Sequence, residues 1–342
     1  MSRQARARQL TIGLLVLLPL TLLAALALGS VSLGLHESLQ AIIQLAQQPE
    51  NRSAIIVNQI RLPRALLAGL VGALLGISGA AMQGIFRNPL ADPSLIGVTA
   101  GASLGASLVI AGVGSGIHGL TGLTLVSAGA FTGGMLAVIL VYRLASSENG
   151  TSVATMLLAG IAITALAGAM SNILELFSSN EVLRRISLWR MGGLDGADYS
   201  RVALAAAIFL VVMTVLPRYA TALNAFLLGE SEARYLGVDV EKTKTGIVLL
   251  VAIAVGASVA MAGTIAFVGL VVPHIIRLLI GPDHRYLLPA SAIAGALLLI
   301  SADIIARTLI APTELPVGIV TACIGVPFFI SLLHRRRDFG MQ

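Results

Sequence analysis

Two arginines three residues apart, Arg61 and Arg64, stand just before a long apolar run and have the chemistry to bind carboxylates. A guanidinium is a planar fork that matches a carboxylate, so the pair indicates an acidic docking partner outside the membrane. Cations at a helix N-terminus oppose the macrodipole by about 0.3–1 kcal/mol each, and a docking role would offset that cost. The alternative is that both long side chains simply reach up to the membrane interface.

Asp303, Arg307 and Glu314 form a second charged group, near the end of another apolar run. A charge at the bilayer centre costs about 2.5–3.5 kcal/mol, so such residues usually pair, face a cavity or lie near an interface. One interpretation is an ion pair between Asp303 and Arg307, which are four residues apart. In the other, Arg307 joins Arg61 and Arg64 as a third docking cation.

Three further residues lie near the end of the apolar run over 153–177: Met170, Asn172 and Glu175. They could face a translocation pathway, because polar groups within a span usually face a cavity or a pathway. They could equally belong to a helix end in the headgroup region. The sequence leaves both interpretations open.

Within the connection over 218–245, the segment 227–238 is too polar to span a membrane, and its glycines predict one or two short helices set off by Gly229 and Gly237. Such a piece either lies on the membrane or fits a cleft of a partner. The residues expected to make the contact are Leu228, Gly229, Glu230, Glu232, Ala233, Leu236 and Gly237.

The sequence contains no catalytic constellation and no nucleotide-binding motif. It lacks the G-x-x-x-x-G-K-[ST] phosphate loop, and its only lysines are Lys242 and Lys244. No Cys/His cluster has the spacing of a zinc site, and Cys323 is the single cysteine. We expect no catalytic residue, metal or cofactor in this chain, so an energised transport cycle would need ATP hydrolysis elsewhere.

The elements that must position these residues are membrane spans. Of 342 residues, 57% are hydrophobic and only 11% charged, whereas a soluble domain averages about 25% charged residues. This composition excludes nearly every class of water-soluble enzyme. The pI of about 10.1 is explained by loops that face anionic lipid, so no nucleic-acid partner is expected.

Ten apolar runs are candidate spans, since about 20 apolar residues cross a bilayer. They cover 10–29, 65–82, 95–113, 120–142, 153–177, 202–217, 246–268, 270–281, 286–306 and 315–333. The first is expected to remain uncleaved, and the seventh and eighth are divided where Gly263, Gly269 and Pro273 interrupt the run. We therefore predict an all-α integral membrane protein with one domain over 1–342.

Orientation follows from the placement of lysine and arginine. With both termini in the cytoplasm, fourteen of the 22 basic residues face inward. Spans two to five and seven to ten then begin on opposite sides, so a repeat between the halves is inverted. Within the second span, Gly69, Gly72, Gly76 and Gly79 lie on one helix face and predict close packing against a neighbour.

Nine short segments along the chain together carry a family resemblance. In the first half they read QIRLPR (59–64), GAAMQ (79–83), NPLADP (88–93) and LIGV (95–98). In the second half they read LGE (228–230), GTIAFVGLVVPH (263–274), DHR (283–285), LLP (287–289) and ELPVGIVT (314–321). Together they resemble the permease family for iron chelates, haem and cobalamin, the membrane subunits of type II ATP-binding-cassette importers.

The resemblance implies a homodimer around a central pathway in a bacterial inner membrane, with two cytoplasmic ATPases and a periplasmic binding protein. The ATPases would bind ATP and Mg²⁺. By motif, Arg61 and Arg64 would meet acidic residues of the binding protein, with Arg307 a third docking cation. The segment 227–238 would seat in the ATPase and switch the pathway between outward and inward openings.

The cargo is indicated by two further segments, 158–162 and 183–192, which look closer to the haem and siderophore members of that family. We therefore expect an iron chelate, haem first, with cobalamin as the alternative. A hypothesis from a different class is a secondary transporter driven by an ion gradient. It needs a titratable or cation-coordinating site in the spans, for which Glu175 and Asp303 are the only candidates.

Overall fold

The structure is a computed structural model that describes the chain except residues 1–2, 32, 45–50, 114–119, 149 and 339–342. Its principal helices coincide with the ten predicted spans. They are α1 (Arg3–Ala27), α4 (Leu62–Ile85), α5 (Val98–Val113), α6 (Leu120–Ala145), α7 (Val153–Leu176), α9 (Tyr199–Val215), α12 (Val240–Ala262), α13 (Val268–Ile280), α14 (His284–Thr308) and α15 (Val317–Asp338).

Seven of the described helices are long and apolar enough to cross a membrane, and α5, α13 and α15 add shorter apolar stretches. The chain is therefore a multi-pass helical membrane protein, as its composition predicts. Short elements lie in the connections. They are α2 (Leu35–Gln44), α3 (Arg52–Ile55), the π-helix η1 (Ile56–Arg61), the 3₁₀-helices η2 (Pro93–Ile96) and η3 (Leu216–Tyr219), α8 (Asn180–Arg190), α10 (Ala220–Phe226) and α11 (Glu230–Tyr235).

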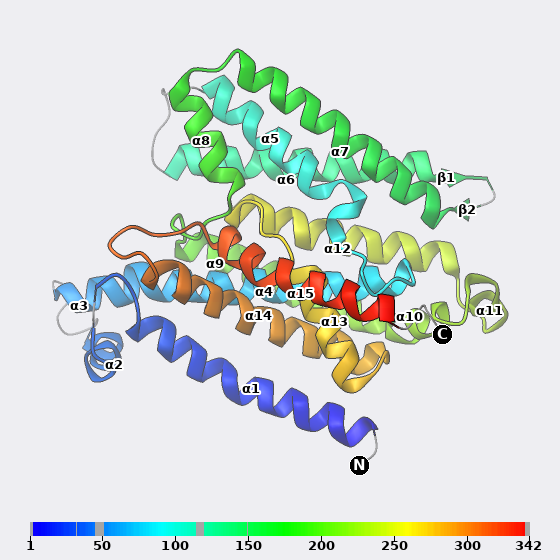
Figure 1. The fold of residues 1–342 in the computed structure, drawn as a ribbon, viewed down its shortest axis with the longest axis horizontal. Helices are drawn as coiled ribbons and strands as arrows, with labels where there is room; N and C mark the ends of the chain where they lie inside the picture. Colours follow the sequence, from blue (N-terminus) through cyan, green and yellow to red (C-terminus); the bar gives the residue numbers. More distant parts are fainter. Residues whose placement is uncertain (1–2, 32, 45–50, 114–119, 149, 339–342) are drawn as a thin grey trace.

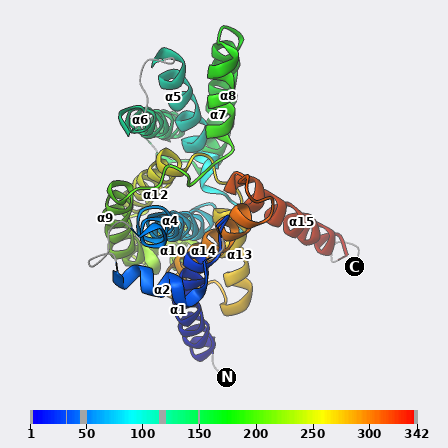
Figure 2. The same cartoon turned by 90° about the vertical axis from the view of Figure 1, so that its left-hand side faces the viewer.

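The helices pack in two groups on either side of α12. Helices α5, α6 and α7 contact one another on one side, while α4, α13, α14 and α1 pack together on the other (Figure 1). Helix α12 contacts α5 and α6 in the first group and α4 in the second. Figure 2 shows α15 leaving the bundle, and much of its apolar surface is exposed.

The two ends of the bundle carry different short elements. The start of α1, the end of α15, α10 and α11 lie at the right-hand end of Figure 1. A two-stranded hairpin between α6 and α7, β1 (Ser146–Ser147) with antiparallel β2 (Gly150–Thr151), lies there too. We name this the hairpin end. Helices α2 and α3 lie at the opposite end, which we name the arginine end.

Two connections within the membrane domain are irregular, and they occupy corresponding places in the two halves. In the first half η2 separates α4 from α5, and Gly97 after it has a φ of +80°. In the second half residues 263–267 separate α12 from α13, and Gly263 has a φ of +66°. The predicted division of 246–281 is thus confirmed, but its proline reason is wrong, because Pro273 lies inside α13.

Helix α4 approaches its neighbours with no side chain between the backbones. A Cβ atom on Gly72 would lie 2.2 Å from the carbonyl oxygen of Gly295 in α14. One on Gly79 would lie 1.8 Å from the carbonyl oxygen of Gly269 in α13, and Gly76 is equally crowded. The predicted close packing of this glycine face is confirmed, and it makes α4 the most enclosed span.

We predict that Gly79→Ala destabilises the folded protein by about 3 kcal/mol or more, because backbone must move to admit the methyl group. Thermal unfolding in detergent measures the loss. Gly13→Ala in α1 is the matched control, since its Cβ meets nothing within 4 Å and alanine favours a helix. Equal unfolding temperatures for the two variants would contradict the packing argument.

Candidate functional site

The arginine end is built on a helix that starts earlier than expected. Helix α3, η1 and α4 form one continuous 34-residue helix from Arg52 to Ile85. Proline lacks an N–H, and its ring crowds the carbonyl four residues earlier in a helix. Directly before Pro63 the helix widens into a π-turn, in which the N–H of Leu62 donates to the carbonyl oxygen of Val57. This wider turn accommodates the proline ring. The two arginines at 61 and 64 therefore lie inside a helix, and the expected macrodipole cost at its N-terminus does not arise.

Arg61 is buried and fastens the end of α1. Its Nη1 donates to the carbonyl oxygens of Leu26 (2.6 Å) and Ala27 (2.9 Å). Arg307 donates from Nη2 to the carbonyl oxygen of Ala25 at 3.1 Å. The last carbonyls of a helix lack partners within it, and cations are favourable there. Two arginines thus cap the C-terminus of α1.

Arg64 and Arg307 share a buried carboxylate. Arg64 Nε lies 2.8 Å from Asp303 Oδ1 and its Nη1 2.6 Å from Glu314 Oε2. Arg307 Nε lies 2.9 Å from Asp303 Oδ2, so the ion-pair interpretation of these two residues is confirmed. All three arginines of this cluster, Arg61 included, are buried. Each of them has partners inside the protein, and the docking role expected of all three stays a prediction.

A cavity of about 590 Å³ adjoins this cluster. Arg64 and Glu314 form part of its wall, together with Trp189 and Arg201. Arg201 is held by a hydrogen bond from Nη1 to the carbonyl oxygen of Met261 at 3.2 Å. The cluster thus borders a half-open cavity.

The three candidate pathway residues of α7 separate into two environments. Met170 and Asn172 are exposed on the described surface of α7. Glu175 is half-buried and pairs with Arg190 of α8, with 2.9 Å between Oε1 and Nη1. The structure therefore ties Glu175 to a neighbouring helix, and a lining role for Met170 and Asn172 stays a prediction.

At the hairpin end, the segment over 227–238 folds as one short helix, α11, between Gly229 and Gly237, as predicted, and α10 precedes it. Gly229 and Gly237 have φ values of +131° and +83°, which favour glycine at these boundaries. Ala233 faces inward and is buried, whereas Leu228 and Tyr235 are 67% and 91% exposed. Leu236 is exposed beside them.

The three exposed residues Leu228, Tyr235 and Leu236 form what we name the α11 patch. Large apolar side chains that remain exposed outside the spans mark an interaction site. Tyr235 was missing from the expected contact residues, although an aromatic residue within a charged stretch is a usable signal. Of the expected residues, Glu232 and Gly237 are also exposed, whereas Gly229 is buried.

A side-chain amide attaches α10 to the second helix group. Asn224 Nδ2 donates to Asp283 Oδ1 at 2.7 Å, and the backbone N–H of His284 donates to Asn224 Oδ1 at 2.9 Å. These residues begin α14, so the start of that helix holds α10. Sequence reasoning missed Asn224, because its partners lie about sixty positions away.

Among the described residues, no three His, Cys, Asp or Glu side chains are grouped to hold a metal ion. What the structure offers is a bundle of spans, an internal acid–base cluster at one end and an exposed apolar patch at the other. These features define a multi-pass helical membrane protein with a distinct polar or apolar feature at each end.

The chain belongs to the FecCD transport family, which matches residues 16–335. It is the permease subunit of an ATP-binding-cassette importer, a class that works with ATPase and substrate-binding partners. The resemblance read from the sequence motifs is confirmed.

Similar proteins cover nearly the whole chain. A hemin transport system permease of Yersinia pestis is 44% identical over 321 residues, 93% of this chain and 95% of that protein. A cobalamin import system permease of Halobacterium salinarum is 45% identical, over 82% of this chain and 74% of that protein. An iron(3+)-hydroxamate import system permease of Bacillus subtilis is 40% identical, over 94% and 82% respectively.

Among solved structures, a metal-chelate type ABC transporter in an inward-facing conformation has the same fold. Its TM-score is 0.81 at 32% sequence identity, and the match covers 96% of this chain and 99% of that one. The fold and the class of function thus rest on independent likenesses.

Proposed function

We propose that this permease imports an iron chelate, haem first, in a bacterial inner membrane. The observation that carries the proposal is the end-to-end likeness to a hemin permease at 44% identity. A periplasmic binding protein delivers the cargo, two ATPases bind ATP and Mg²⁺, and a second copy of the chain completes the pathway. Cobalamin is the second candidate cargo, favoured by the relative that is 45% identical.

The hairpin end is the cytoplasmic end in this proposal. It carries the start of α1, the end of α15 and the α11 patch (Figure 1), and the orientation places fourteen of the 22 basic residues on that side. The α11 patch seats in the ATPase, because an exposed cluster of Leu and Tyr loses its apolar hydration on contact.

The ion-gradient alternative has little support from its two candidate residues. Asp303 is paired with two arginines and Glu175 with a third. Each carboxylate is thus already occupied by guanidinium partners, which a coupling cation would have to displace. A coupling ion would therefore need a site that these residues do not supply.

Docking of the binding protein belongs to the arginine end. Arg61 and Arg307 hold α1 there, so their part in docking is to fix the shape of this end. Arg64 borders the cavity and is the arginine that an acidic side chain of the partner can reach, in competition with the half-buried Glu314. Exchange of one carboxylate for another keeps the guanidinium paired throughout.

Import itself is tested in proteoliposomes that hold the chain with its ATPase and binding protein. We expect uptake of haem that requires ATP on the hairpin side and the binding protein on the other side. Ferric siderophore and cobalamin are compared at equal concentrations. Preferred uptake of cobalamin would overturn the cargo, and haem uptake without the ATPase under a proton or sodium gradient would overturn the class.

The ATPase contact is tested with Leu228→Glu and Tyr235→Glu together. Charges on the α11 patch cannot be buried without cost, so we expect loss of ATPase in co-purification by at least about tenfold. Arg285→Asp, an exposed change outside the patch at the start of α14, is the control and should retain the ATPase. Equal retention by both variants would contradict the assigned contact.

Docking through Arg64 is tested with Glu314→Gln, which removes the competing charge and keeps the side-chain shape. We expect binding-protein affinity, measured on nanodiscs, to rise by about three- to tenfold, because one arm of the guanidinium then lacks its anionic partner. Glu37→Gln, at the same end on α2, is the matched control and should leave affinity unchanged. An affinity that stays equal or falls in Glu314→Gln would argue against Arg64 as a docking cation.

A further inference from the structure

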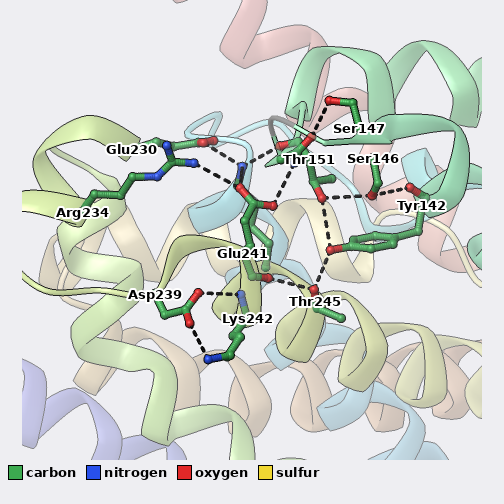
Figure 3. Close-up of polar contacts among 12 residues, drawn as sticks. Tyr142, Ser146, Ser147, Thr151, Glu230, Arg234, Asp239, Glu241, Lys242 and Thr245 are labelled. Carbon is green, nitrogen blue, oxygen red and sulfur yellow. Dashed lines mark hydrogen bonds and ion pairs between the residues drawn. The ribbon is translucent and has the colours of Figure 1, made fainter.

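The two lysines of the chain lie two residues apart on α12 but in opposite environments. Lys242 is 88% exposed along its side chain and pairs with Asp239, with 2.9 Å between Nζ and Oδ2. Lys244 is 1% exposed. Its partners Thr151, Glu230 and Glu241 are labelled in Figure 3. A buried ammonium is costly unless its donors are all used, so the partners of Lys244 are informative.

Lys244 bridges two segments that are distant in sequence. Its Nζ donates to the carbonyl oxygen of Thr151 at 2.7 Å and to Glu230 Oε2 at 2.7 Å. Glu241 Oε1 lies 3.8 Å away and provides a second negative charge. Thr151 belongs to the hairpin before α7, and Glu230 is the first residue of α11. One ammonium group thus connects the hairpin with the short helix that carries Tyr235 and is flanked by the two leucines of the α11 patch.

The hairpin is held to α12 through both backbone groups of one residue, Thr151. While Lys244 binds the carbonyl of Thr151, Glu241 Oε2 accepts the N–H of the same residue at 2.8 Å. Space is also tight, since a Cβ atom on Gly150 would lie 2.6 Å from Glu241 Oε1. The hairpin therefore cannot shift relative to α12 without breaking these bonds.

A tyrosine of α6 reinforces the same junction. Tyr142 Oη lies 2.6 Å from Thr245 Oγ1 of α12, and Thr151 Oγ1 donates to Tyr142 Oη at 3.2 Å. Figure 3 shows these hydroxyls beside the hairpin and Glu241. The end of α6, the hairpin and the start of α12 thus form one connected set of hydrogen bonds.

Helix α11 is joined to the network at both its ends. Glu230 at its start binds Lys244, and Arg234 in its last turn lies 3.3 Å from Glu241 Oε1. The positive charges of Lys244 and Arg234 are thus matched by the negative charges of Glu230 and Glu241. Because both ends of this six-residue helix are tied, a displacement of α11 carries α12 and the hairpin with it.

The hairpin leads directly into a span. Thr151 is followed by Ser152, whose side chain accepts the N–H of Thr155 and caps the N-terminus of α7. We propose that Lys244 is the positioning residue through which movement of α11 reaches α7. The proposal rests on the proposed function, because it takes α11 as the seat of the ATPase. Helix α7, which carries Met170 and Asn172, is then moved from its cytoplasmic end.

Transport coupling is the first test, with Lys244→Met in the reconstituted transporter together with its ATPase and binding protein. Methionine keeps an unbranched stem and removes the donors. We expect cargo transported per ATP hydrolysed to fall about tenfold, with ATPase co-purification retained. Lys242→Met is the matched control and should leave the ratio unchanged, since its pair is exposed.

A second variant serves if Lys244→Met fails to assemble. Glu230→Ala removes the α11 half of the bridge from a partly exposed position and leaves Lys244 with Thr151 and Glu241. It should lower the cargo transported per ATP hydrolysed as much as Lys244→Met does. The variant that carries both substitutions should lower it no further, because each substitution alone already breaks the Lys244–Glu230 contact. Wild-type ratios in Glu230→Ala and Lys244→Met, or fully additive losses, would overturn the proposal.

Motion is the readout that a merely structural lysine would not alter. Spin labels on Glu148→Cys in the hairpin and Ser231→Cys in α11, with Cys323→Ser, report one distance without nucleotide and after trapping with ATP and vanadate. We expect an unchanged distance between the two states with Lys244 present and a changed one in Lys244→Met. A distance that changes with Lys244 present would overturn the transmission role.

Failure of the proposed function gives a different result. If the variant with Leu228→Glu and Tyr235→Glu retains the ATPase, the assignment of the ATPase contact to α11 is wrong, independently of the results for Lys244. If Lys244→Met and Glu230→Ala themselves lose the ATPase, the pair builds the contact surface, and the transmission proposal is overturned while the seat on α11 stands.

Discussion

An ionised side chain that leaves water must meet opposite charge or aligned dipoles, and this requirement shapes both ends of the protein. At the arginine end Asp303 lies between Arg64 and Arg307, Glu314 accepts from Arg64, and a carbonyl of α1 accepts from Arg307. At the hairpin end Lys244 lies between Glu230 and a backbone carbonyl. In both places a partnered charge joins elements that have no covalent connection nearby.

The two clusters differ in what they hold together, and this difference suits their places in a transporter. The arginine cluster joins long helices, α1, α4 and α14, whose mutual positions it fixes. The lysine network joins a short exposed helix to a hairpin at the mouth of α7. In the function proposed above, partner binding at the first cluster acts on a fixed frame, whereas partner movement at the second is transmitted to α7.

The spans were predictable because their signal is local. Apolar runs of sufficient length mark helices whatever their neighbours are, and Gly72 and Gly79 mark a close helix contact because spacing alone puts them on one face. The irregular segment after α12 was also visible, through Gly263. Its assignment to Pro273 failed, since α13 continues through that proline.

The charged sites were predictable in position and unpredictable in environment. Arg61 and Arg64 stood out correctly, but the start of their helix at Arg52 was hidden within a segment that reads as a long connection. Their burial depends on Glu314 and on the end of α1, which lie far away in sequence. Partner choice among distant charges is a property of the packed bundle, and a single sequence does not contain a local signal for it.

The contact between Gly72 and Gly295 restricts how this sequence can vary over generations. Each glycine, given a Cβ, would place it 2.2 Å from the other's carbonyl oxygen. Because the obstacle on both sides is main chain, a smaller side chain elsewhere cannot make room. No second substitution can compensate for a side chain at either position, so both positions must remain glycine. The lipid-facing positions of the same helices can exchange one apolar residue for another.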